Sequence, residues 1–153
     1  DEFEKNDIDY TILTQGTDNK TKLLKKFKND GNSILIGSLS FWEGVDVRGS
    51  GLSLVIIDKL PFQSPGDPIF ESKINMLKDK GINAFMTFQL PKAIISLKQG
   101  AGRLIRDEED KGVLMICDQR IISKPYGNKF WRSLPDFKRT RNQNDVIDFL
   151  KDL

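Results

Sequence analysis

The stretch LKQGAGRLIR, residues 97–106, carries one glutamine and two arginines at helical spacing: Gln99, Arg103 and Arg106. At about 100° per residue in a helix, these side chains form one narrow polar stripe. A guanidinium presents five fixed donors that suit phosphate oxygens, and it can stabilise charge growing on a transferring phosphoryl group. The stripe therefore indicates a phosphate site. The alternative is a solvated face paired with the acidic residues 107–110 (DEED).

Two glycines, Gly100 and Gly102, interrupt this helical pattern. Each costs about 1 kcal/mol in a helix relative to alanine, which makes sense if a ligand must approach the backbone closely. The helix is predicted over residues 90–105, with Pro91 in its first turn. Its buried stripe is predicted to contain three apolar residues: Ile94, Ala101 and Ile105.

Strands and helices are predicted to alternate along the chain. Apolar or β-prone runs at residues 10–13, 33–37, 52–58 and 112–118 predict strands, the last three covered on both faces as in parallel sheets. Helices are predicted from a cap at Thr17 or Asp18 to about Gly31, and over residues 67–80, 90–105, 126–134 and 142–153. This order predicts an α/β layered domain whose ligands bind at the carboxyl ends of the strands.

Composition excludes several classes of protein. With 153 residues, 38% of them hydrophobic and 30% charged, the chain suits one soluble domain rather than a membrane protein. The absence of histidine excludes the usual zinc sites and catalytic triads, so no metal site is predicted. The single cysteine, Cys117, excludes an internal disulfide, favours a cytoplasmic location and is predicted to be buried in its strand. The net charge is +2, with basic segments at residues 20–28 and 124–141 as candidate contact surfaces.

The polar stripe also carries a family resemblance. The pattern Gln99-x-x-Gly102-Arg103-x-x-Arg106 resembles motif VI of superfamily 2 helicases. The longer string LPKAIISLKQGAGRLIRDEEDKGVLMICDQRI resembles the DinG-type, XPD-related branch of bacterial DNA helicases. Residues 37–49 resemble motif V of that branch, and the likeness extends over residues 15–141.

This resemblance implies that residues 1–153 are the second RecA-like motor domain of a larger ATP-dependent 5′-to-3′ DNA helicase. The implied fold has three layers, with helices flanking a mostly parallel sheet. ATP would lie between two such domains, and Arg103 and Arg106 would reach its phosphates from the opposite side of the cleft. Gln99 would sense the nucleotide or couple it to motion, and Gly102 would lie beside it. The implied partners are single-stranded DNA and the first RecA-like domain of the same parent chain, in the bacterial cytoplasm and nucleoid and in DNA repair.

Motif V follows the run SILIG as a loop with small hydroxyls and a predicted helical turn at residues 41–44. Exposed amides at such a turn can hold a backbone phosphate. The resemblance implies that this loop contacts DNA through Ser38 and Ser40. The resemblance also implies that three later residues bind the nucleotide or couple it to the DNA: Glu43, Gly44 and Asp46. The alternative is a plain connection whose two aromatic residues, FW at positions 41–42, pack in the core.

Several helicase parts are missing from the chain. No G-x-x-x-x-G-K-[ST] string is present, so the groups that hold ATP and Mg²⁺ are expected mainly in the first motor domain. Any iron–sulfur cluster is likewise expected elsewhere in the parent protein. The chain alone is therefore predicted to lack ATPase and unwinding activity. Two other classes of function stay open: a stand-alone nucleic-acid-binding module with a degenerate motor fold, and an unrelated α/β enzyme acting on a phosphorylated small molecule.

Overall fold

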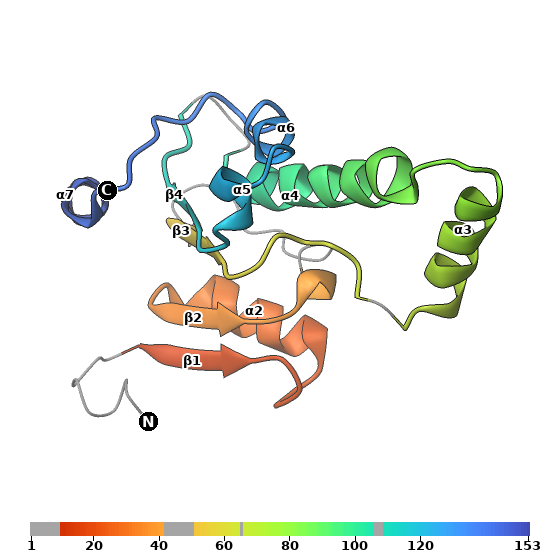
Figure 1. Cartoon of the computed structure of the whole chain (residues 1–153). Coiled ribbons are helices and arrows are strands. Elements are labelled where there is room, and N and C mark those ends of the chain that lie inside the picture. The colour runs from red at the N-terminus through yellow and green to blue at the C-terminus, as the bar shows by residue number, and fades with distance from the viewer. Residues whose placement is uncertain (1–9, 42–50, 65, 106–108) are drawn as a thin grey trace. The chain divides into compact units, whose positions relative to one another are not determined.

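The computed structural model describes residues 10–41, 51–64, 66–105 and 109–153. The contacts within the chain divide it into two compact units, Asp1–Gly51 and Leu52–Leu153. Each unit is described by itself, with the elements labelled as in Figure 1.

The first unit contains a parallel pair of strands joined through a helix. The strands are β1 (Thr11–Thr14) and β2 (Ser33–Ile36), which pair in parallel with Leu13 opposite Leu35. Between them lies α2 (Lys20–Asp30), and after β2 comes the short 3-10 helix η1 (Leu39–Phe41). The core of this unit is formed by the buried side chains of Leu13, Leu23 and Phe41.

Helix α2 begins at a different cap from the predicted one. Asn19 has an extended backbone, and its side-chain oxygen accepts a hydrogen bond from the amide of Lys22 at 2.8 Å. The prediction of Thr17 or Asp18 is wrong, because the side chain of Asp18 instead accepts from the Asn19 amide and pairs with the ammonium of Lys22 at 2.7 Å. The predicted end is confirmed, since Gly31 caps the helix with φ +72°.

The second unit holds the remaining elements. They are β3 (Leu54–Ile57), α3 (Pro68–Asp79), the π-helical turn η3 (Phe85–Gln89), α4 (Leu90–Leu104), β4 (Val113–Ile116), α5 (Arg120–Ser123), α6 (Gly127–Trp131) and α7 (Gln143–Lys151). Strands β3 and β4 pair in parallel, and α4 packs against both of them. Figure 1 shows the carboxyl-terminal end of α4 beside this pair, with α3 near its opposite end. The unit therefore places the carboxyl-terminal turn of α4 next to the strands.

Helix α4, which carries the polar stripe, begins at Leu90 as predicted, but an unpredicted helical turn precedes it. Asn83 caps the whole segment, accepting the amide of Met86 on its side chain at 3.1 Å, and η3 leads directly into α4. Pro91 therefore lies inside a longer helical segment. Its ring lacks an N–H and would clash with the carbonyl four residues earlier in a regular helix. The wider π turn just before it gives the required room, and the amide of Leu90 bonds to the carbonyl of Phe85.

The buried face of α4 also differs from the predicted stripe. Ala101 is buried as predicted, but Ile94 and Ile105 are only half-buried. The core face is instead formed by Leu90, Ala93, Leu97, Gly100, Ala101 and Leu104. Gly100 is thus a core residue, and the interpretation of it as space for a ligand is wrong. A small residue there lets the helix approach its neighbours closely.

The pair β3–β4 is covered on one face only within the described part of its unit. Ile57 is buried, whereas Ile56 and Met115, which are register partners, are 58% and 48% exposed. The prediction that Cys117 is buried is wrong, because the residue is exposed. Its amide continues the ladder to the carbonyl of Ile57, and alternate residues of a strand share a face, so Cys117 lies on the open side with Met115.

The predicted α/β class with parallel strands is confirmed and agrees with a RecA-like fold. The sequence also predicted α3 closely, with Asp67 at its N-cap and Lys80 at its C-cap. Among the described residues, the helices are too short or too polar to cross a bilayer.

Candidate functional site

The carboxyl-terminal part of α4 presents two of the three stripe residues on one side of the helix. Gln99 is exposed and Arg103 is half-buried, and residues four apart lie one above the other on a helix surface. The helix ends at Leu104, and the backbone of Ile105 is extended. Arg106 lies outside the described residues. The structure therefore brings Gln99 and Arg103 together, while the position of Arg106 stays a prediction.

Gly102 lies between these two polar residues and has open space beside it. Among the described residues, no atom outside its own helix segment lies within 4 Å of the place that a Cβ would occupy. A ligand can therefore approach the backbone here more closely than at a residue with a side chain. Of the two glycines, only Gly102 keeps the interpretation that a nucleotide needs room.

The carboxyl-terminal end of α4 packs closely against the strands through Leu104. A Cβ at Gly112, just before β4, would lie 2.5 Å from Leu104 Cδ1 and 3.0 Å from the carbonyl oxygen of Ser53. The absence of a side chain at Gly112 thus lets Leu104 reach the strand pair. This packing holds the last helical turn, which carries Arg103, in a defined place.

The predicted DNA contacts follow the carboxyl end of β2. Ser38 is exposed there, at the edge where ligands bind to parallel strands. The backbone of Ser40 lies in η1, and the turn predicted over residues 41–44 lies, apart from Phe41, outside the described residues. The remaining groups lie outside the described residues: the side chain of Ser40, and Glu43, Gly44 and Asp46.

One residue that the sequence analysis did not single out contacts this loop. The side-chain oxygen of Gln15 accepts a hydrogen bond from the amide of Ser38 at 2.7 Å. Gln15 follows β1 directly and Ser38 is the second residue after β2, so both lie at the same edge of a parallel pair. That placement was the available signal, because residues at strand carboxyl ends are candidates for ligand contact.

A second unforeseen group lies at the matching edge of β3–β4. The carboxylate of Asp118 accepts hydrogen bonds from the amide of Leu60 at 2.8 Å and from Arg120 Nη2 at 2.6 Å. The Arg120 guanidinium also lies 5.2 Å from the centroid of the Phe62 ring. The guanidinium of Arg120, and next the backbone donors, hold the pKa of Asp118 at about 2. Asp118 therefore links the loops that follow β3 and β4.

Replacing Asp118 by asparagine should lower the free energy of unfolding at neutral pH by roughly 2 kcal/mol, because hydrogen bonds to a charged acceptor are lost. The pKa of Asp118 is depressed from 3.8 to about 2, so its contribution is present above about pH 4 and is lost as the pH falls through about 2. Urea unfolding of the purified protein between pH 2 and 7 should show a flatter pH dependence in the variant. Asp136→Asn is the matched control at an exposed carboxylate. Equal pH profiles for wild type and Asp118→Asn would contradict this assignment.

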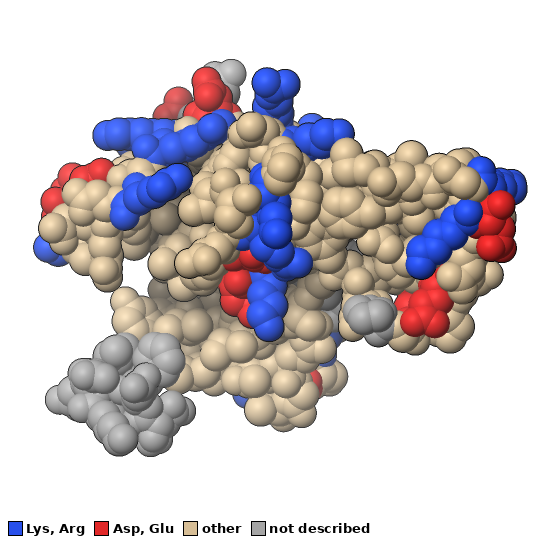
Figure 2. Space-filling model, in the orientation of Figure 1, with Lys and Arg blue, Asp and Glu red and all other residues tan. Residues whose placement is uncertain are grey.

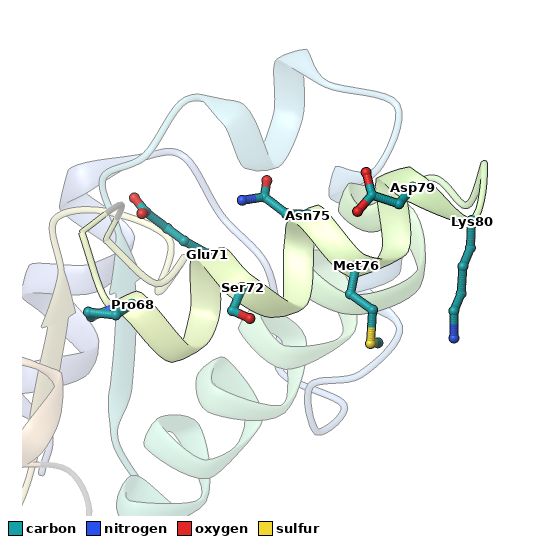
Figure 3. A pocket seen from close by; sticks show the side chains of 7 residues that line it. All are labelled: Pro68, Glu71, Ser72, Asn75, Met76, Asp79 and Lys80. Carbon is teal, nitrogen blue, oxygen red and sulfur yellow. The ribbon is translucent and has the colours of Figure 1, made fainter.

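Two other surface features lie along α3 and over α6 with the segment that follows it. A shallow hollow lies along one side of α3, and Figure 3 shows its lining side chains projecting from that helix. It contains none of the predicted site residues. Figure 2 shows Lys and Arg side chains along the upper edge of the drawn face, over α6 and the segment that follows it. In that segment the Arg139 guanidinium lies 4.9 Å from the centroid of the Trp131 ring.

Comparison with known proteins gives the family of the chain. The model of the helicase C-terminal domain matches residues 1–137. The chain belongs to the helicase C-terminal domain family. Its similarity to DinG and YoaA proteins identifies it as a helicase C-terminal domain of the DinG type, as the resemblance implied.

Three relatives of the chain are much longer than the part that it matches. The ATP-dependent DNA helicase YoaA of Haemophilus influenzae is 51% identical over 141 residues, which are 92% of this chain and 22% of that protein. The ATP-dependent helicase DinG of Mycobacterium tuberculosis is 41% identical over 142 residues, 93% of this chain and 21% of that protein. The 3′-5′ exonuclease DinG of Bacillus subtilis is 43% identical over 126 residues, 81% of this chain and 14% of that protein. The chain thus spans about a fifth of the length of the first two relatives and less of the third.

Proposed function

We propose that this chain is the second motor domain of an ATP-dependent 5′-to-3′ DNA helicase and acts on ATP held by a first motor domain of the same parent protein. The observation that carries the proposal is the accessible side of α4, where Gln99 and Arg103 flank the open backbone of Gly102. Two of the chain's relatives are an ATP-dependent DNA helicase and an ATP-dependent helicase, which supports the proposal.

In this proposal the arginines act across the cleft between two domains. Arg103, and by resemblance Arg106, would meet the phosphates of ATP only when the cleft closes, which makes hydrolysis depend on domain closure. Mg²⁺ would neutralise phosphate charge, held mainly by groups of the first motor domain. The fixed donors of Arg103 suit phosphate oxygens, and the seat of Leu104 against Gly112 would keep this arginine in place.

We assign the contact with single-stranded DNA to the loop that follows β2. Its small hydroxyl residue Ser38 is exposed at the carboxyl edge of β1–β2, where a backbone phosphate can approach. Ser40 and, for coupling to the nucleotide, Glu43, Gly44 and Asp46 share this assignment by resemblance. A protein with these groups would act on DNA in the bacterial cytoplasm. Paired arginines favour a motor over a pure binding module, because binding alone does not require groups that stabilise a transition state.

The purified 153-residue chain should bind single-stranded DNA but show no appreciable ATP hydrolysis, because no P-loop string is present in it. Binding can be measured by fluorescence anisotropy at several salt concentrations, and hydrolysis by phosphate release with and without DNA. A steep loss of affinity with salt is expected for phosphate contacts. DNA-stimulated hydrolysis by the chain alone would contradict the proposal that a first motor domain holds the ATP. The absence of any DNA binding would count against the helicase assignment.

A further inference from the structure

The start of the motif V loop is held by the side chain of a residue from the neighbouring strand. Gln15 Oε1 accepts the amide of Ser38 at 2.7 Å, and the amide of Gln15 donates to the carbonyl of Ile36 at 2.8 Å. Gln15 therefore contacts the chain on both sides of Gly37. These two bonds tie the turn after β1 to the end of β2.

Gln15 is itself fixed by a tight turn. The amide and the hydroxyl of Thr17 both donate to the carbonyl of Thr14, at 3.2 and 2.8 Å. Gly16, next to Gln15, has φ +98°, a backbone conformation that side chains disfavour. The turn thus sets where the backbone of Gln15 lies, and its side chain reaches Ser38 from a defined origin.

The other end of the loop's first turn is anchored in the core. The amide of Phe41 donates to the carbonyl of Ser38 at 2.9 Å, and Phe41 is 5% exposed. Its ring packs over Gly37, where a Cβ would lie 2.9 Å from the ring carbon Cγ. Ser38 is therefore held from two directions, by Gln15 at its amide and by the buried Phe41 at its carbonyl.

We propose that Gln15 is a positioning residue for the single-stranded DNA contact: it orients the Ser38 peptide so that the Ser38 hydroxyl meets a DNA phosphate. The inference rests on the proposed function, because it assumes that this loop binds DNA. Gln15 and Ser38 are both exposed, so water can replace their hydrogen bond at little cost in stability. Water cannot fix the orientation of the Ser38 peptide as Gln15 does. Loss of the hydrogen bond should therefore weaken DNA binding more than it lowers stability.

The test uses the full-length protein with Gln15→Ala, Ser38→Ala and the double variant. We expect Gln15→Ala to weaken binding of an oligothymidine about fivefold, and to raise by the same factor the DNA concentration that half-maximally stimulates ATP hydrolysis. The melting temperature should stay at its wild-type value. Gln15→Glu, which keeps an acceptor at the same reach, should bind more strongly than Gln15→Ala in high salt, where its added charge is screened. Gln143→Ala, at an exposed glutamine in α7, is the matched control.

The double variant separates positioning from independent effects. If Gln15 acts through Ser38, the two substitutions are non-additive, and the double variant binds no more than about twofold more weakly than the weaker single variant. Multiplied effects, an unchanged affinity of Gln15→Ala, or a loss matched by a lower melting temperature in both Gln15→Ala and Gln15→Glu would overturn the inference. If Ser38→Ala also binds DNA like wild type, the DNA assignment of this loop fails. If Ser38→Ala alone weakens binding, only the role of Gln15 fails.

Discussion

Replacing Arg106 by alanine in the full-length protein should lower DNA-stimulated ATP turnover by roughly 10³, the scale typical of arginines that stabilise a transferring phosphoryl group. Arg103→Ala should have an effect of the same kind, because the proposed function puts both arginines at the phosphates. Each change removes a guanidinium that interacts with the transition state more strongly than with bound ATP, so the turnover rate should fall while KM changes little. Single-stranded DNA binding should persist, since these residues lie outside the loop assigned to DNA. The measurements are steady-state ATPase assays and anisotropy titrations on the same preparations.

A lysine on the same helix is the control for this experiment. Lys98 is exposed on α4 next to Gln99, and Lys98→Ala removes a positive charge without touching the motif. Its turnover should stay within about twofold of wild type, as for most surface substitutions. Wild-type turnover in Arg106→Ala would remove Arg106 from the site, and an equal loss in Lys98→Ala would show that net charge rather than a placed guanidinium matters.

Gly127→Ala should be strongly destabilising, lowering the free energy of unfolding by about 3 kcal/mol or more. A Cβ at Gly127 would overlap the carbonyl oxygen of Ile121 and lie 2.6 Å from the carbonyl carbon of the same residue. Both atoms belong to the backbone of α5, so a rotamer change cannot relieve the clash. The backbone must move instead, and next to it lies Phe130, which is completely buried. Urea unfolding monitored by circular dichroism would measure the loss.

Gly102→Ala is the matched control for the same chemical change. The site beside Gly102 is open and the residue lies inside a helix, so alanine should leave stability unchanged or raise it by up to about 1 kcal/mol. A similar loss of stability in both variants would show that the clash at Gly127 is not the cause. Equal stability of Gly127→Ala and wild type would contradict the packing between α5 and α6.

The sequence predicted best where a local signal sets the structure. Helix α3 is an example, because Asp67 accepts the amides of Ile69 and Phe70 on its side chain and Pro68 suits the first turn. The parallel strands were found for a similar reason, since continuous runs of Ile, Val and Leu between turn residues have few other uses. These features depend on a few neighbouring residues, so a single sequence contains them in full.

Predictions that depend on distant contacts were less accurate. The helical projection of α4 could not show which apolar side meets β3 and β4, so Ile94 was predicted as core in place of Leu97. The π turn before Pro91 and the exposure of Cys117 were missed for the same reason, because each depends on how the segment packs or pairs. The interpretation of Gly100 was wrong for the same reason, because the sequence of a helix does not show whether a glycine faces a ligand or the core.

By itself, the sequence determined the family, the alternation of strands and helices, and the spacing that aligns Gln99 with Arg103, because these depend on residue type and local period. Only the tertiary structure decided that Gly102 rather than Gly100 is open, that Asp118 joins two strand ends, and that Gln15 holds the amide of Ser38. Gln15 and Ser38 are 23 residues apart, and Leu60 and Asp118 are 58 apart. Parallel strands bring their carboxyl ends to one edge, so these contacts exist only once the strands have paired.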